Sequence, residues 1–303
     1  MLSNNTRFLV YIVIYFTLNV WFMAKLLKKI GDNIVSRINF NVKRKLNNKD
    51  IVIPVINGVK VGVSGEKWMS GVLKEVFEYA SEGTFYDVGI NLGQTMIKVM
   101  TLNEHISYVG FEPNPSCLFY LQHLISANKW SRNIIVPVAL SDADCLLPLY
   151  GSSDTDPEST IIRDLQLTSD FITKIVPVFR YESIVKNILN KKVSVIKVDV
   201  EGAELDVIDS LRTLIEKDRP TIIMEVLPNE HEDTLKSLRN KKLIDLMKRL
   251  QYSFYRIIKT STDSYAGVSA VDNVGDYDDP VMKDHIFFPN EDMTRIKNFI
   301  TIL

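Results

Sequence analysis

The chain has 303 residues, of which 46% are apolar and 24% charged, and its net charge is −1. This composition is that of an ordinary globular protein and argues against an intrinsically disordered chain. The near-neutral charge gives no reason to expect a nucleic-acid partner, while two cysteines in a chain of this length argue against a disulfide framework and fit a reducing compartment.

The first feature along the chain is an uncharged apolar segment at 8–24, followed by Lys25, Lys28 and Lys29. Its length is at the short end of what spans a bilayer, and the basic residues behind it would keep the rest of the chain in the cytoplasm. The segment is therefore predicted either to anchor the protein in a membrane or to form a buried or membrane-surface helix of a cytoplasmic protein. Together with a basic linker, it makes up residues 1–45, ahead of a single domain at 46–303.

From residue 51 onward, the apolar pattern predicts strands that alternate with helices. A hairpin with a turn at Asn57-Gly58 is expected at 51–63, and an amphipathic helix at 68–80. Strands are expected at 85–88, 107–111, 134–140, 193–198 and 221–226, and helices at 93–103, 115–127, 181–189, 203–216 and 233–250. This alternation predicts a parallel sheet with helices on both faces. The segments 253–258 and 284–288 have no clear helix between them and are expected to pair antiparallel at one edge.

Two segments interrupt this alternation. The segment 142–175 contains the polar run GSSDTDPEST, which has no periodicity, and it is expected to be a loop insertion that would form a lid over a site. The segment 260–283 is expected to be a second loop. Its acidic part at 272–279 lacks the spacing of a calcium loop and is interpreted as solvated.

The most informative stretch is FYDVGINLG at 85–93, an apolar run that ends in Asp87 and continues with Gly89, Asn91 and Gly93. It predicts a strand, a tight turn and a helix start, where glycines allow a sharp turn and a close approach to a ligand. Asp87 would repel the pyrophosphate of a dinucleotide, whereas S-adenosylmethionine carries a cationic sulfonium and ammonium. The turn therefore favours S-adenosylmethionine and argues against an NAD-dependent oxidoreductase.

Further polar residues follow the other predicted strands, at the carboxyl ends where ligands of open α/β sheets bind. They are Glu112, Ser141, Asp142, Asp199, Glu201 and Glu225. Glu112 lies 25 residues after Asp87, close to where an acidic residue binds ribose hydroxyls, and Ser141 and Asp142 would meet an adenine amino group. Acids crowded at one edge of a sheet cost stability, so their presence favours a functional site.

Three of these acids could take part in chemistry. Asp199 and Glu201 are candidates for a general base, which a hydroxyl needs because it is a poor nucleophile at neutral pH. Alternatively, Asp199 and Glu225 would hold Mg²⁺, since carboxylates on adjacent strand ends suit a hard cation. A purely structural explanation is that Asp199 or Glu201 caps the helix predicted at 203–216. Of the two chemical roles, the base is preferred.

The motifs DVGINLGQT, YVGFEPNP, ALSD and IKVDVEGAE, in this order and spacing, resemble the FkbM family of S-adenosylmethionine-dependent methyltransferases. Trp68 in the opening helix and the late motif DHIFFP are also similar to that family. The resemblance extends over about residues 51–290. It implies the seven-stranded class I methyltransferase fold and methylation of a hydroxyl, commonly on a sugar or a secondary metabolite.

The resemblance also implies roles for individual residues. The positions that would line the methionine end of the cofactor are Asp87, Gly89, Asn91 and Gly93. Glu112 would bind the ribose, and Ser141 and Asp142 would lie near the adenine.

Two other function classes stay open. Asp154-Thr155-Asp156 has the spacing of the DxD pair that binds a metal diphosphate in nucleotide-sugar glycosyltransferases, which a membrane anchor would also suit. It follows a polar run rather than an apolar strand, so a loop is the preferred interpretation. The second alternative is a non-catalytic scaffold that keeps a methyltransferase fold. Its sequence hint is Ile90, which stands where the family usually has alanine.

Overall fold

The computed structural model describes residues 38–163, 172–188, 191–229, 234–277 and 280–292. The apolar segment 8–24 lies outside these residues, so its role as an anchor stays a prediction. Within the described ranges, no helix is both long enough and apolar enough to cross a membrane.

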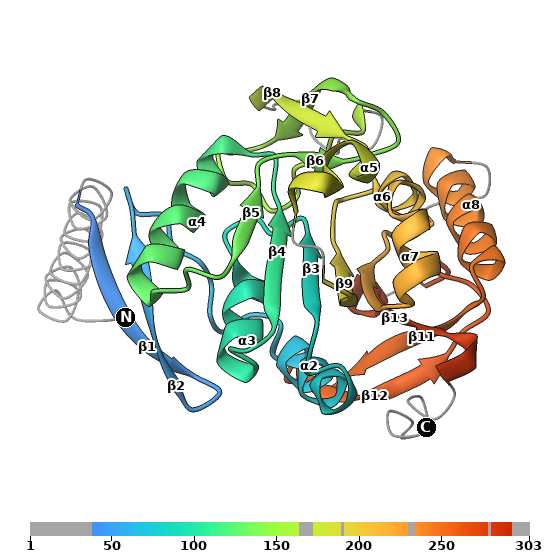
Figure 1. Cartoon of the computed structure of the whole chain (residues 1–303), viewed down its shortest axis with the longest axis horizontal. Helices are drawn as coiled ribbons and strands as arrows, with labels where there is room; N and C mark the ends of the chain where they lie inside the picture. Colours follow the sequence, from blue (N-terminus) through green and yellow to red (C-terminus); the bar gives the residue numbers. More distant parts are fainter. Residues whose placement is uncertain (1–37, 164–171, 189–190, 230–233, 278–279, 293–303) are drawn as a thin grey trace, which may run out of the picture.

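A mixed sheet of eight strands forms the centre of the fold (Figure 1). Its strands are β3 (Thr84–Val88), β4 (Ser107–Phe111), β5 (Ile134–Val136), β9 (Val193–Val198), β10 (Thr221–Glu225), β11 (Tyr252–Lys259), β12 (Tyr265–Ala270) and β13 (Asp284–Pro289). Their order in space is β12-β11-β13-β10-β9-β3-β4-β5. The strands from β10 to β5 are parallel, and β13, β11 and β12 add antiparallel pairs. The carboxyl ends of β3, β4, β9 and β10 therefore meet at one edge of the sheet.

Helices cover both faces of this sheet, as predicted (Figure 1). One face carries α2 (Lys67–Tyr79), α3 (Gln94–Leu102) and α4 (Pro115–Asn128), and the other carries α5 (Tyr181–Ile184), α6 (Glu204–Ser210), α7 (Arg212–Asp218) and α8 (Leu235–Arg249). Each face of the sheet has its own hydrophobic core, and successive residues of a strand point to opposite cores. Phe85 packs with α2 to α4, and Tyr86 packs with α5 to α8. This division follows from the two-residue repeat of a strand.

The prediction of seven strands is wrong by one, because the segment expected to be a loop at 260–283 contains β12. Among the described strands, this one pairs with β11 alone, at the outer edge, and its sequence YAGVSA lacks a strong apolar alternation. A half-exposed edge strand leaves little signal in a sequence. The predicted antiparallel pair is confirmed as β11 and β13. The single helix expected at 203–216 is divided into α6 and α7, which meet at Leu211.

The hairpin in front of the sheet begins earlier than predicted. β1 (Phe40–Leu46) and β2 (Lys49–Val55) pair antiparallel through a turn at Asn47-Asn48, so part of the expected linker is a strand. β1 is largely exposed and rich in basic residues, and it therefore has no apolar pattern. The turn predicted at Asn57-Gly58 is present and is closed by backbone hydrogen bonds of 2.9 and 2.8 Å between its flanking residues.

The insertion expected to be a loop contains a small sheet. β7 (Cys145–Gly151) pairs antiparallel with β8 (Ile172–Phe179), which pairs parallel with β6 (Ala139–Leu140). The strand expected at 134–140 is divided between β5 and β6, because Pro137 between them has no N–H group to continue the ladder. In Figure 1 the small sheet lies at the top, beyond the main sheet.

Candidate active site

The glycine turn that follows β3 is a left-handed segment between that strand and α3. Gly89, Asn91 and Gly93 have φ angles of 83°, 49° and 89°, a region that L side chains rarely adopt. A Cβ atom at Gly89 would lie 1.8 Å from the backbone oxygen of Asp199. The glycine turn thus lies in close contact with the backbone that follows β9, and position 89 must be glycine because a side chain would not fit there.

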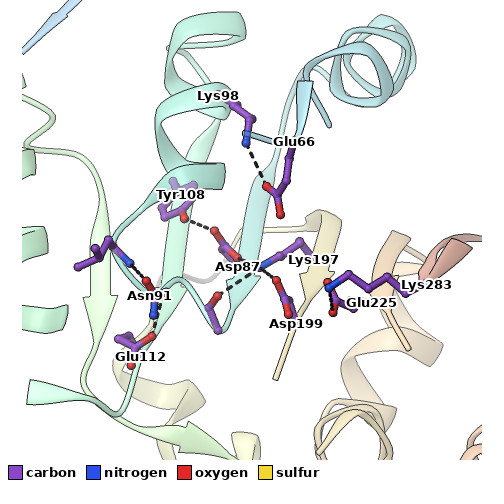
Figure 2. A network of polar contacts seen from close by, with 12 residues as sticks. Glu66, Asp87, Asn91, Lys98, Tyr108, Glu112, Lys197, Asp199, Glu225 and Lys283 are labelled. Carbon is purple, nitrogen blue, oxygen red and sulfur yellow. Dashed lines mark hydrogen bonds and ion pairs between the residues drawn. The ribbon is translucent and has the colours of Figure 1, made fainter. Parts of the chain in front are cut away.

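Glu112, directly after β4, joins the glycine turn to the next loop. Its buried carboxylate accepts the backbone N–H of Asn91 at 2.7 Å (Figure 2) and that of Asn114, also at 2.7 Å. Burial raises the pKa of Glu112 to about 7, although these two N–H groups act in the opposite direction. The charge of this carboxyl therefore changes near neutral pH.

A pocket of about 600 Å³, its open mouth included, lies at these strand ends. Its wall combines the turns after β3 and β4, strand β6, the loop after β9 and the insertion. Residues from each part are Gly89, Asn91, Glu112, Leu140, Leu149 and Asp199. The insertion closes one side of the pocket, which is the position of the predicted lid. Of the cofactor positions inferred from the sequence, the pocket brings together Gly89, Asn91 and Glu112, whereas Gly93 is not part of its described wall.

Ser141 and Asp142 follow β6 but are not part of the described wall of this pocket. The Ser141 hydroxyl donates to the Asp142 carboxylate at 3.2 Å, and Asp142 faces a separate surface pocket beside Asp206 and Arg249. Near them, the pocket wall is apolar. Their role at the adenine stays a prediction. The apolar wall was missed because such residues look like ordinary core in a sequence.

Asp87 lies beneath the glycine turn, fully buried, and not in the described wall of the pocket. It accepts the Tyr108 hydroxyl at 2.5 Å and lies 3.5 Å from the ammonium group of Lys197 (Figure 2). The same ammonium lies 3.1 Å from Asp199 and donates to the backbone oxygen of Gly89 at 3.2 Å. Burial acts against the charge of Lys197, but the two carboxylates outweigh it and raise its pKa. Lys197 thus links β3, the glycine turn and Asp199.

Three predicted acids form a cluster, because carboxylate oxygens of Asp199, Glu201 and Glu225 all lie within 4.8 Å of one another. Asp199 is paired with Lys197, and Glu225 with Lys283 (Figure 2). Within the described part of the chain, no lysine or arginine pairs with Glu201 in the same way. Burial and the neighbouring Asp199 raise the pKa of Glu201 to about 8.

The capping explanation for Asp199 and Glu201 does not fit the structure. The N-cap position of α6 is Ala203, with no side-chain cap, and Glu204 instead accepts the N–H of Gly202 at 2.8 Å. Glu201 also has a φ of 52°, a conformation that costs energy for a residue other than glycine. Such strain is often found at functional sites, and the Glu201 carboxylate lies close to those of Asp199 and Glu225.

Asp154 and Asp156 make hydrogen bonds and an ion pair within the insertion. Asp156 accepts the backbone N–H of Ser152 at 2.5 Å and that of Glu158 at 3.0 Å, and Asp154 is paired with Lys174 at 3.2 Å. These contacts shape the loop and agree with its interpretation as a loop rather than a metal-diphosphate site.

Comparison with known sequences decides the family. The methyltransferase FkbM domain matches residues 87–254, more than half of the chain. The chain belongs to the FkbM methyltransferase family. The matched range includes the glycine turn, Glu112 and the acid cluster. No curated protein matches the chain at a significant level.

Solved structures that are similar to this FkbM-family chain include three methyltransferases. An FkbM methyltransferase from Methylobacillus flagellatus has 13% identity and a TM-score of 0.41, over 69% of this chain and 44% of that one. An O-methyltransferase from Bacillus cereus in complex with SAH has 9% identity and a TM-score of 0.44, over 75% and 80%. A precorrin-6y C5,15-methyltransferase from Geobacter metallireducens has 11% identity and a TM-score of 0.38, over 72% and 84%. The chain thus spans less than half the length of the Methylobacillus protein.

Proposed function

We propose that this protein methylates a hydroxyl group on a sugar, a glycan or a secondary metabolite, with S-adenosylmethionine as the methyl donor. The observation that carries the proposal is the position of Asp199. It lines the pocket of the glycine turn and also belongs to the acid cluster. A methyl donor bound in the pocket and an acceptor hydroxyl bound at the acid cluster would therefore meet at Asp199.

The residues of the pocket fit this cofactor. Glu112 offers carboxylate oxygens to a ribose, and Gly89 and Asn91 bring backbone close to the ligand. Leu140 and Leu149 supply an apolar surface for an adenine ring. When bound, S-adenosylmethionine supplies a methyl group on a positively charged sulfur.

Glu201 is the general base in this proposal, and Asp199 holds the acceptor hydroxyl beside it. The hydroxyl oxygen forms a bond to the methyl carbon while the carbon–sulfur bond breaks, and the hydroxyl proton moves to the Glu201 carboxylate. Asp199 is less suited to accept the proton, because the ammonium of Lys197 lies 3.1 Å from it. A base with a pKa close to the working pH is efficient, which suits the value of about 8 for Glu201.

A magnesium ion bound by Asp199 and Glu225 is the alternative way to activate the hydroxyl. Glu225 is already paired with the ammonium of Lys283, so it has less need of a metal ion. This favours a general base over Mg²⁺. We therefore expect methyl transfer to be unchanged by EDTA and by added Mg²⁺. If EDTA abolishes activity, Mg²⁺ restores it and Glu225→Gln is as damaging as Asp199→Asn, the metal is required and the base assignment is wrong.

Glu112 allows a test of the cofactor that does not depend on the acceptor. Ribose hydroxyls donate to the ionised carboxylate, so binding should release a proton wherever Glu112 is protonated in the free protein. Because its pKa is about 7, the affinity for SAH is expected to be constant above that pH. Below it, affinity should fall about tenfold per pH unit, since one proton is linked to binding.

Isothermal titration calorimetry at several pH values, in buffers of different ionisation enthalpy, measures this linkage. Glu112→Gln should bind SAH more weakly at pH 8, by about 1–3 kcal/mol, and should lose the pH dependence. Glu104→Gln, at an exposed ion pair with Lys49, is the matched control and should behave as wild type. Equal affinity in wild type and Glu112→Gln would remove Glu112 from the cofactor site.

The two other function classes receive less support from the structure. Ile90 is buried in the core, and its side chain packs against Gly110. A Cβ atom added to Gly110 would lie 2.8 Å from the Ile90 side chain. Ile90 is not in the described wall of the pocket, so it gives no reason to infer a scaffold that has lost its cofactor. A thermal-shift comparison of S-adenosylmethionine with a uridine diphosphate sugar separates the methyltransferase from the glycosyltransferase.

A further inference from the structure

Another ion pair, formed by Glu66 and Lys98, lies on the α2 and α3 side of the acid cluster (Figure 2). The two side chains are joined at 3.1 Å, yet their exposure differs greatly: the Lys98 side chain is 2% exposed and that of Glu66 is 36% exposed. Burying a lysine is costly unless it is paired. The buried ammonium therefore holds a glutamate whose side chain is still partly exposed.

The backbone at Glu66 is adapted to this position of the side chain. Glu66 is the N-cap residue of α2, with φ 49° and ψ 53°, and its side chain makes no capping hydrogen bond. A left-handed conformation costs roughly 1–2 kcal/mol for such a residue, and glutamate is not among the preferred N-cap residues. The first helical N–H, that of Lys67, is bound instead by Asp263 at 3.0 Å. Helix formation thus does not explain a glutamate here.

Electrostatics connects Glu66 to the active site. Burial alone would raise the pKa of Glu66, but the ammonium groups of Lys98, Lys197 and Lys283 outweigh it and lower the pKa. Lys197 and Lys283 are also the partners of Asp199 and Glu225. Glu66 therefore shares its counter-ions with the acid cluster, although it is not in the described wall of the cofactor pocket.

We propose that Glu66 is a specificity-determining residue that binds a second hydroxyl of the methyl acceptor, and that Lys98 is the positioning residue that holds it. This inference rests on the proposed function. The acceptor would lie between Glu66 on one side and Glu201 on the other, with its reacting hydroxyl at Glu201. Ionised carboxylates are strong acceptors for hydroxyl donors. Lys98 and Lys197 lie buried behind these carboxylates, and Lys283, which is partly exposed, is paired with Glu225. A neutral acceptor is therefore favoured over an acidic one.

The test measures binding rather than turnover. The full chain, saturated with SAH, is titrated with the methyl glycosides of glucose, galactose and mannose and with methyl glucuronide, by saturation-transfer difference NMR. At least one neutral glycoside is expected to bind, and methyl glucuronide to bind more weakly than methyl glucoside. Glu66→Gln should weaken the neutral glycoside about tenfold without changing the affinity for SAH.

Two controls separate recognition from stability. Asp263→Ala removes the bond to the first turn of α2 but keeps Glu66, so it should lower the melting temperature and leave glycoside binding unchanged. Lys98→Met should weaken glycoside binding as Glu66→Gln does. Glycoside binding that is absent from wild type, equal in Glu66→Gln, or equally reduced in Asp263→Ala overturns the inference. If wild type does not bind SAH, the proposed function itself fails.

Discussion

Replacing Glu201 by glutamine is expected to lower methyl-transfer turnover about 10²–10⁴-fold while the affinity for SAH changes little. The amide keeps the size of the side chain but cannot accept the hydroxyl proton. Because the pKa of Glu201 is about 8, activity in the wild type should rise with pH up to that value and then level off. The variant should lose this rise. Single-turnover rates between pH 6 and 9 measure both effects.

Glu204→Gln is the matched control, since Glu204 lies in the same motif and, among the described residues, its hydrogen bond is to the local backbone N–H of Gly202. It should lower the melting temperature and leave turnover per folded molecule unchanged. Asp199→Asn is expected to lower turnover as well, and it also removes a charge that Lys197 needs. Full activity in both Glu201→Gln and Asp199→Asn would contradict the position of the active site at these strand ends.

The sequence predicts the fold well where apolar residues repeat with a clear period. Phe85 and Tyr86 pack on opposite faces of the sheet, and helices α2, α3, α4 and α8 lie where the 3.6-residue pattern places them. The helix expected at 181–189 is shorter, since α5 ends at Ile184 and a 3-10 turn follows. The prediction fails where the structure depends on contacts between distant residues. β1 is held by pairing with β2 and β12 by pairing with β11, and neither has an apolar repeat of its own.

The candidate site could be predicted in part, because its acids follow strands and parallel strands end at one edge. The sequence could show one counter-ion but not the other. Lys197 is two residues before Asp199, so it could be expected to neutralise this acidic edge. Lys283 is 58 residues from Glu225 in the chain and meets it only after folding. The sequence also could not place Glu66, which is 133 residues from Asp199 in the chain. A glutamate just before a helix gives no signal of the left-handed conformation found there.

Gly89→Ala is expected to weaken cofactor binding strongly and to destabilise the fold at the same time. The new methyl group would lie 1.8 Å from the backbone oxygen of Asp199, and this oxygen cannot rotate away as a side chain would. The φ of 83° adds strain for any residue with a Cβ atom, roughly 1–3 kcal/mol. The turn and the chain after β9 must therefore separate, which displaces Asp199 from the pocket.

Gly62→Ala is the matched control for this prediction, because the nearest atom to its new Cβ would be Gln94 Oε1 at 3.8 Å, an ordinary contact. Thermal unfolding and SAH calorimetry on both variants make the comparison. Gly62→Ala should match wild type, whereas Gly89→Ala should melt several degrees lower, since a loss of even 1 kcal/mol lowers the melting temperature by roughly 2–4 °C in a protein of this size. It should also bind SAH at least about 100-fold more weakly, the effect of losing close to 3 kcal/mol. If Gly89→Ala has the melting temperature and SAH affinity of wild type, the close approach of the turn to β9 is not what shapes this pocket.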